Sequence, residues 1–182
     1  MSKLFVVSGC SGVGKNTVLN QVMARRKDLR FSVSATTRAP RPGEVDGVHY
    51  YYVTEAEFQG MIDRGEMLEY DFHNDTYYGT PLHQVKQGAD HIILDIEPVG
   101  AFNVRSAYPD AVLIFIKPPS MEELERRLRS RGDTSEEQML MRLKRAAWEL
   151  EQAPKYDYVV VNDVVEDCVN EILNIIAEKA DE

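Results

Sequence analysis

The stretch GCSGVGKNT at residues 9–17 has the residue types that can hold a phosphate group. Glycines let a backbone bend so that successive N–H groups point at phosphate oxygens, and the dipole of a following helix adds positive charge. The spacing matches the phosphate-loop pattern GxxxxGK[ST] at Gly9, Gly14 and Lys15 and departs from it at Asn16. An apolar run precedes the stretch and a helix-like one follows it. This context favours phosphate binding over a glycine-rich turn with an exposed lysine.

Asn16 stands where the pattern expects a hydroxyl that ligates magnesium. An amide oxygen is a poorer ligand than a hydroxyl in a hydrated octahedral magnesium site. Either the metal relies more on water and nucleotide oxygens, or the hydroxyl of Thr17 contributes indirectly. Asp95 ends a second apolar run, where a carboxylate can hold magnesium through water. We therefore predict Thr17 and Asp95 as candidate metal residues.

A second group of phosphate-binding side chains lies in the segment TTRAPRPGE. Arg38 and Arg41 are three residues apart on a turn that Pro40 and Pro42 stiffen. A guanidinium group can grip a dianionic phosphate with two hydrogen bonds, which a lysine cannot do. Taken alone, the pair favours ordinary surface arginines.

Four short apolar, β-branched runs predict buried strands, at residues 4–9, 91–96, 111–117 and 158–163. Stretches with a period near 3.6 follow, among them 17–26 and 120–131, the latter opened by a predicted capping box of Ser120 and Glu123. Strands that alternate with helices indicate a parallel sheet with helices on both faces. The core of the protein is therefore predicted to be α/β.

Two other regions depart from this alternation. Residues 32–80 contain short strand-like runs, proline and glycine turns, and a short helix opened by Thr54 and Glu57. They indicate a small mixed or antiparallel lobe inserted in the core. The segment SRGDTSEEQMLMRLKRAAWELEQA, residues 130–153, indicates a loop and a long amphipathic helix.

Length and composition set broader limits. A chain of 182 residues with 43% hydrophobic and 28% charged residues fits one globular domain. The net charge of −9 argues against a general nucleic-acid binder. No apolar run approaches the ~20 residues that span a bilayer, and the start does not resemble a signal peptide. A cytoplasmic location is expected, and Cys10 and Cys168 are expected to be incidental thiols.

Three segments together carry a family resemblance: SATTRAPRPGEVDGVHYYYV at 34–53, GEMLEYDF at 65–72 and TYYGTP at 76–81. The chain resembles guanylate kinases, which move a phosphoryl group from ATP to GMP, from the loop at residue 9 to YDYVVVND at 156–163. The resemblance implies one domain over residues 1–182. Its core would comprise about 1–31, 81–120 and 150–182, its GMP-binding lobe about 32–80, and its lid about 121–149.

The resemblance also implies roles for individual residues, with ATP, GMP or dGMP, and Mg²⁺ as ligands. Lys15, Arg131 and Arg142 would be catalytic, the two arginines from a mobile lid. ATP would contact Ser11, Gly12, Val13, Gly14, Lys15, Asn16 and Thr17. GMP would contact Ser34, Arg38, Arg41, Tyr50, Glu69, Tyr78, Thr80 and Glu97.

Glu69 is the residue expected to choose the base. Guanine presents two adjacent donors, N1–H and the exocyclic amine, which one carboxylate accepts in parallel. Adenine presents an acceptor at N1, so the same carboxylate would face a lone pair. This argues against adenine as the acceptor base, although another nucleoside monophosphate stays open as an alternative acceptor.

The match to the family is weaker in one segment. Glu97-Pro98-Val99-Gly100 replaces the usual D-x-Q-G, so the contact of Glu97 with guanine is the least secure of the set. A non-catalytic guanylate-kinase-like module that binds phosphorylated peptides is the alternative function. No role is predicted for Arg126, Arg127, Arg129, Arg145 or for the histidines His49, His73, His83 and His91.

Overall fold

The computed structural model describes residues 2–86, 88, 90–132 and 134–180. Its core is a five-stranded parallel sheet with the order β2-β7-β1-β8-β9. The strands are β1 (Leu4–Gly9), β2 (Leu29–Phe31), β7 (His91–Asp95), β8 (Val112–Lys117) and β9 (Tyr158–Val161). All four predicted strands are confirmed to within a few residues. The sequence analysis missed β2, because three residues are too few to show a periodic pattern.

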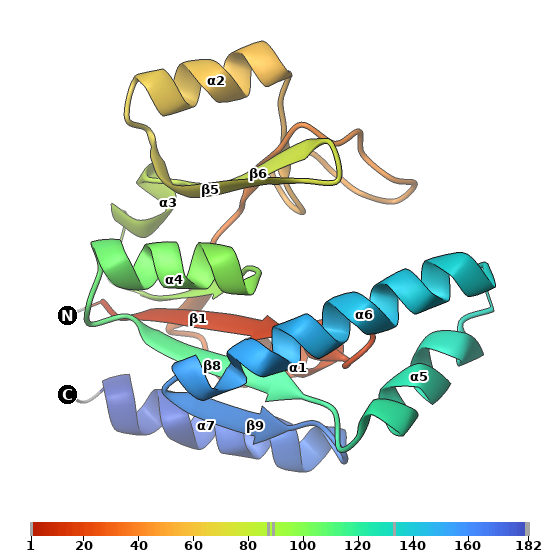
Figure 1. Ribbon diagram of the computed structural model, residues 1–182. Helices are drawn as coiled ribbons and strands as arrows, with labels where there is room; N and C mark the ends of the chain where they lie inside the picture. Colours follow the sequence, from red (N-terminus) through yellow and green to blue (C-terminus); the bar gives the residue numbers. More distant parts are fainter. Residues whose placement is uncertain (1, 87, 89, 133, 181–182) are drawn as a thin grey trace.

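The central strands are buried on both faces, which is why they consist of continuous apolar runs. Phe5, Val6 and Val7 of β1 and Ile114 of β8 are fully buried. Helix α4 (Pro98–Ala107) covers one face of the sheet, and α7 (Val165–Ala180) lies on the other (Figure 1). Helix α1 (Lys15–Arg25) packs beside α7. The predicted α/β class is confirmed.

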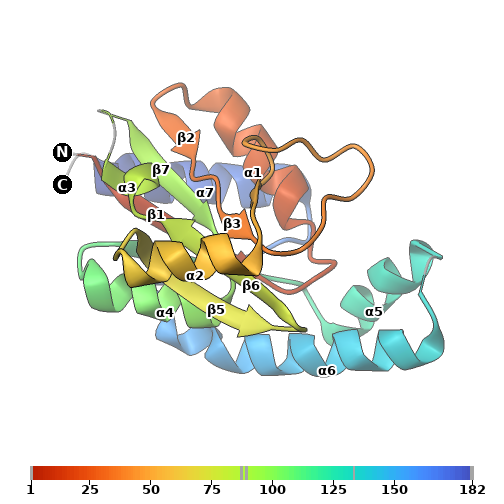
Figure 2. The same cartoon turned by 90° about the horizontal axis from the view of Figure 1, so that it is seen from above.

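A second, four-stranded sheet forms the small lobe, in the order β4-β3-β6-β5. It comprises β3 (Ala35–Thr36), β4 (Tyr51–Tyr52), β5 (Met67–His73) and β6 (Thr76–Pro81). β3 pairs parallel with β4 and antiparallel with β6, so the sheet is mixed. Helix α2 (Glu55–Asp63) covers it on the side away from the core, and α3 (His83–Lys86) follows it (Figure 2). Thr54 and Glu57, which were predicted to open this helix, form a capping box at the start of α2.

Two helices extend to one side of the core, α5 (Met121–Ser130) and α6 (Glu136–Gln152). The single turn η1 (Ala153–Lys155) follows α6. Half of the capping box predicted for α5 is wrong. Ser120 does accept from the backbone N–H of Glu123 at 3.1 Å, but the Glu123 carboxylate accepts from Arg126 and Arg127 instead of from the backbone of Ser120. Two guanidinium groups on the next turn outcompete one backbone amide for the charged acceptor.

Within the described residues, none of the helices has both the length and the apolar character that a membrane crossing requires.

Candidate active site

The glycine-rich loop connects β1 to the start of α1. Gly12 and Gly14 have φ angles of 85° and 88°, in the left-handed region that only glycine adopts at little cost. A side chain at Gly14 would also place its Cβ 2.8 Å from Nδ2 of Asn162. The loop ends at Lys15, the first residue of an 11-residue helix. Backbone amides at the start of such a helix form an anion-binding site.

Two residues that the sequence analysis did not single out hold this loop in place. The Asn162 side chain donates from Nδ2 to the carbonyl oxygen of Val13 at 2.7 Å, in a buried position. Arg127 of α5 donates from Nη1 to the same carbonyl at 3.4 Å and to the carbonyl of Asn162 at 2.9 Å. The C=O and N–H groups of one trans peptide unit point in opposite directions. Hydrogen bonds to the Val13 carbonyl therefore orient the neighbouring loop amide away from Asn162 and Arg127. A polar residue directly after the apolar run of β9 was the available signal for Asn162.

Lys15 and Asp95 form an ion pair at the carboxyl end of the sheet, where β1 and β7 lie side by side. Both side chains are partly exposed, at 19% and 31%. The structure thus brings the predicted phosphate-binding lysine and one predicted metal residue together. Asn16 and Thr17 are exposed on the first turn of α1, and Thr17 is not among the residues that face the cleft described below.

Glu69 on β5 faces the core and is the most deeply buried acidic residue of the small lobe. It is 7% exposed, and Thr80 on the paired strand β6 donates to its Oε1 at 2.7 Å. Burial raises the pKa of Glu69 above its ordinary value, and the Thr80 hydroxyl partly opposes the rise. A Cβ at Gly100 would lie 2.8 Å from the other oxygen, Oε2, so only glycine lets α4 approach the carboxylate this closely.

The predicted arginine turn is organised by one carboxylate. Glu44 accepts two hydrogen bonds from Arg38, at 2.9 and 3.0 Å, and one from the backbone N–H of Arg41 at 2.7 Å. The Tyr52 hydroxyl donates to the same carboxylate at 2.8 Å. The guanidinium of Arg38 lowers the pKa of Glu44 to about 2 and lies 5.4 Å from the centre of the Tyr50 ring.

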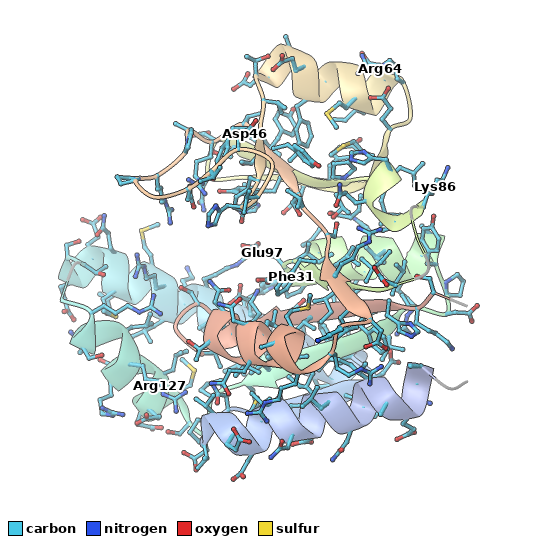
Figure 3. All side chains as sticks on the ribbon, turned by 180° about the vertical axis from the view of Figure 1, so that it is seen from behind. Phe31, Asp46, Arg64, Lys86, Glu97 and Arg127 are labelled. Carbon is cyan, nitrogen blue, oxygen red and sulfur yellow. The ribbon has the colours of Figure 1, made fainter. Side chains whose placement is uncertain are left out.

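These parts surround a cleft of about 470 Å³ between the small lobe and the core, and Glu97 lies where the two meet (Figure 3). Ten of its lining residues were predicted as site residues. They are Ser11, Lys15, Asn16, Ser34, Arg41, Tyr50, Glu69, Tyr78, Asp95 and Glu97. Thr80 and Arg38 are set back from the cleft and contact it through Glu69 and Tyr50. The loop residues Gly12, Val13 and Gly14 do not line it either.

A second cavity of about 780 Å³ opens beside the first and is lined by residues of α6 and of the tip of the β5–β6 hairpin. Arg142 is half-buried and lines this cavity, whereas Arg131 is exposed at the end of α5 and lines neither. The two predicted lid arginines therefore do not meet in this arrangement.

The arginines fall into two groups, according to whether or not they form an ion pair with a carboxylate. Across the described residues, Arg41, Arg131 and Arg142 have no carboxylate partner. Other arginines do form ion pairs, namely Arg25, Arg26, Arg38, Arg64, Arg105, Arg126, Arg127, Arg129 and Arg145. A guanidinium without an internal partner is free to receive an external anion. Of these three arginines, Arg41 was predicted to bind GMP, and Arg131 and Arg142 were predicted to be catalytic residues of the lid.

His73, which was expected to have no role, belongs to a polar cluster with Asp71 and Glu97 at the edge of the cleft. Its ring also stacks on that of Tyr78, with 4.8 Å between centroids and 12° between planes. Arg145, likewise given no role, donates to Glu97 at 2.6 Å. No local pattern in the sequence indicates these contacts, which join β5, α4 and α6.

The parallel sheet, the glycine-rich loop and a cleft lined by Lys15 and the unpaired Arg41 are typical of nucleotide-binding transferases of the α/β class. Comparison with known proteins narrows this class. A sequence model of the family described as guanylate kinase matches residues 1–179. The guanylate kinase of Oceanobacillus iheyensis is 47% identical over 176 residues, covering 95% of this chain and 85% of that protein. That of Desulfitobacterium hafniense is 46% identical over 180 residues, covering 97% and 90%.

The fold gives the same result. The crystal structure of guanylate kinase from Anaplasma phagocytophilum matches with a TM-score of 0.80 at 35% identity, covering 98% of this chain and 86% of that chain. The chain belongs to the guanylate kinase family, as its resemblance to that family implied, and it is an enzyme of that family.

Proposed function

We propose that this chain transfers the terminal phosphoryl group of ATP to GMP, by in-line transfer with Mg²⁺, and yields ADP and GDP. One observation carries the proposal: Lys15 of the glycine-rich loop and the buried acid Glu69 face the same cleft of about 470 Å³ from opposite lobes. A phosphate-binding group and a base-reading group thus line a single space. Phosphoryl transfer depends mainly on such positioning and on charge neutralisation.

The donor side would use the loop and the helical lid. Backbone amides of residues 11–17 would surround the phosphates, and Lys15 would leave Asp95 to neutralise their charge. Arg131 and Arg142 form no ion pair with any described residue and extend from the α5–α6 region. Closure of this region would bring them to the transferring group and exclude water, which prevents hydrolysis of ATP.

The residues near Lys15 fit a weakly held magnesium ion. Asp95 lines the cleft and offers one carboxylate, while Asn16 lines it with a neutral amide. With so few protein oxygens, the ion would keep most of its water and bind through phosphate oxygens. When bound, Mg²⁺ neutralises phosphate charge and fixes the phosphate geometry. Thr17 is exposed and would contribute only indirectly.

The acceptor side would use the small lobe, with Arg41, Arg38, Tyr50 and Tyr78 around the phosphate of GMP. Glu69 would accept from N1–H and the exocyclic amine of guanine, with Ser34 and Thr80 as its hydroxyl partners. These groups would contact base and phosphate, and none of them is assigned to the 2′-hydroxyl. We therefore include dGMP as an acceptor.

The proposed organisation places the GMP-binding lobe at about 32–80 and the lid at about 121–149, in one domain that acts in the cytoplasm. A net charge of −9 disfavours nucleic acid as a partner. The alternative function, a non-catalytic module that binds phosphorylated peptides, is not supported by the curated relatives, which are kinases.

A nucleotide panel tests this proposal. With ATP and Mg²⁺, the purified protein should form ADP rapidly with GMP and dGMP and barely with AMP, CMP or UMP. Glu69→Gln should lower the preference for GMP by about 1–3 kcal/mol, because the amide nitrogen would face the guanine donors. Glu66→Gln is the matched control, since Glu66 is 48% exposed and pairs with Arg64. Equal rates across the panel, or an unchanged preference in Glu69→Gln, would contradict the proposal.

A further inference from the structure

The two cavities meet at a shared border. Ser11, His73, Asn74 and Glu97 line both of them. Glu97 is the N-cap residue of α4, whereas His73 ends β5 on the opposite lobe. A polar contact between these two side chains therefore connects the small lobe to the core at the point where the acceptor cleft opens toward α6.

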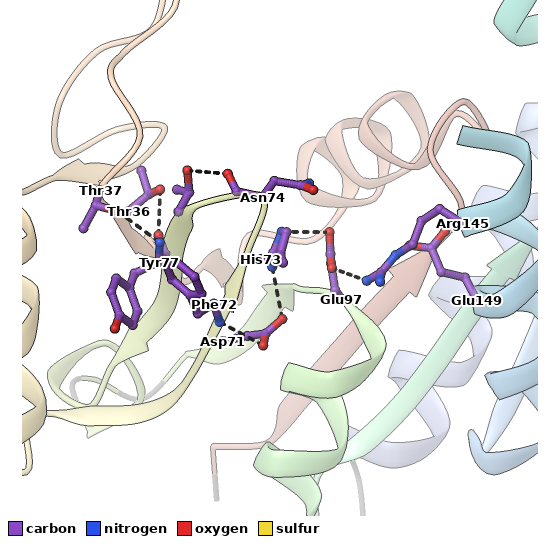
Figure 4. A network of polar contacts seen from close by, with 11 residues as sticks. Thr36, Thr37, Asp71, Phe72, His73, Asn74, Tyr77, Glu97, Arg145 and Glu149 are labelled. Carbon is purple, nitrogen blue, oxygen red and sulfur yellow. Dashed lines mark hydrogen bonds and ion pairs between the residues drawn. The ribbon is translucent and has the colours of Figure 1, made fainter. Parts of the chain in front are cut away.

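A continuous chain of contacts crosses this border (Figure 4). Asp71 and His73 are joined at 3.0 Å through Nδ1, and His73 and Glu97 at 3.5 Å through Nε2. Arg145 donates to the other oxygen of Glu97 at 2.6 Å and to Glu149 at 3.3 Å. The series runs from the small lobe through the core to the long helix α6.

Arg145 is fixed from its own helix as well. Its guanidinium lies 4.5 Å from the centre of the Trp148 ring, and Glu149 is only 4% exposed. Burial raises the pKa of Glu149 and Arg145 opposes the rise, so the guanidinium is the main compensation for a buried carboxylate. The position of Glu97 is thereby tied to a well-anchored group on α6.

The cluster of Asp71, His73 and Glu97 has ligand atoms within 4.8 Å of one another, as a metal site would. However, the two carboxylates face different nitrogens of the imidazole, and one metal ion binds only one of these nitrogens. Arg145 already supplies a positive charge to Glu97. The geometry favours a bridge of ion pairs and hydrogen bonds over a metal site.

We propose that His73 and Arg145 are positioning residues that act through Glu97 to shape the acceptor cleft and tie it to α6. Held at both oxygens, Glu97 stays at the edge of the cleft, and His73 holds the ring of Tyr78 by stacking. The wall of the cleft is then ordered before the acceptor binds, so ordering this wall takes less of the free energy of binding. This inference rests on the proposed function for its kinetic consequence, but not for the bridge itself.

A double-mutant cycle tests the kinetic consequence. His73→Ala and Arg145→Ala should each raise the KM for GMP about three- to tenfold, in the range of directly coupled contacts, with KM for ATP changed less than about twofold. The double variant should have a KM for GMP no higher than that of the more impaired single variant, because both residues act through Glu97. Arg145→Lys should recover part of the loss. Arg126→Ala is the matched control, since Arg126 is 70% exposed and, within the part of the chain that the structure describes, pairs only with Glu123 on its own helix.

Effects that multiply in the double variant, or an unchanged KM for GMP, would overturn the proposal. Thermal unfolding of each variant identifies a loss that comes from misfolding alone, and Glu97→Gln then serves as a second variant that weakens the bridge without changing side-chain size. It should raise the KM for GMP by a similar factor, and no change there would also overturn the proposal.

A measurement without nucleotide separates the bridge from the proposed function. Spin labels at Asp75→Cys on the hairpin and Leu140→Cys on α6 report the distance across the border. Both sites are exposed, whereas Cys10 and Cys168 are 2% and 0% exposed and should not react. The distance distribution should be narrow, and it should broaden with Arg145→Ala. If Arg145→Ala leaves the distance distribution unchanged, the bridge is refuted, even in a protein that phosphorylates GMP. If the distribution broadens in a protein that is inactive with GMP, the bridge stands and the proposed function fails.

Discussion

The glycine-rich loop of the core and the arginine turn of the small lobe are built in opposite ways. The loop is fixed by the surrounding fold: Val13 is fully buried, and its carbonyl accepts from Asn162 and Arg127. The turn is exposed, with Val45 and Val48 at 53% and 64%, and a single carboxylate, Glu44, organises it.

The groups that are proposed to face the phosphates explain the difference. Backbone amides have no freedom of their own, so a loop that uses them must be rigid and supported from behind. Guanidinium groups sit on long side chains and can adjust to a phosphate after it arrives. A turn that uses them needs only local restraint. A substitution in the loop should therefore cost much more than its equivalent in the turn.

The sharpest test compares two glycines with similar backbone angles. Gly14 and Gly43 have φ of 88° and 85°, but a Cβ at Gly14 would lie 2.8 Å from Asn162, and one at Gly43 would meet nothing within 4 Å. Gly14→Ala should reduce kcat/KM about 10²–10³-fold, the size of losing a catalytic hydrogen-bond donor. Gly43→Ala should cost only backbone strain, about 1 kcal/mol in chemical denaturation. Comparable losses of activity in both would remove the contrast.

Removing the support behind the loop should have the next largest effect. Asn162→Ala deletes a buried hydrogen bond and leaves the Val13 carbonyl with the longer contact from Arg127. We expect a loss of stability of about 1–3 kcal/mol and a rise in the KM for ATP that exceeds any rise for GMP. Steady-state kinetics in both substrates measures this. A rise confined to GMP would show that the anchor does not serve the loop.

The smallest effect should come from Glu44→Gln in the turn. Because the pair of Arg38 and Glu44 is partly exposed, with side chains at 17% and 20%, the KM for GMP should rise less than about fivefold. Arg38 lowers the pKa of Glu44 from 4.5 to about 2, so its contribution to stability is present above pH 4.5 and is lost as the pH falls toward 2. Acid unfolding followed by circular dichroism should show a gap between wild type and variant that closes over this range. A gap that widens there would contradict the assigned pair.

Much of the site was predictable because its signals are local. The positions of Lys15, Glu69 and Tyr78 follow from short motifs, and the cleft brings all three together. The start of α2 followed from Thr54 and Glu57, three residues apart. In each case the sequence pattern and the structure that it specifies occupy the same few residues.

The residues that were missed act over long separations. Asn162 supports Val13 from 149 positions away, and Arg145 reaches Glu97 across 48. At Ser120 and Glu123 the local motif predicted a capping box that is only half formed. The Glu123 carboxylate accepts from Arg126 and Arg127, one turn later, instead of from the backbone of Ser120. Spacing along the chain cannot rank partners that compete in space.

By itself, the sequence determined the α/β class, the glycine-rich loop and the arginine turn, since hydrophobic period and turn chemistry are properties of contiguous residues. Only the tertiary structure decided which arginines are paired and which are free, that Glu69 is buried, and that Glu97 is held between His73 and Arg145. Charge interactions depend on distance through space and on exclusion of water, and both arise only when the lobes and helices come together.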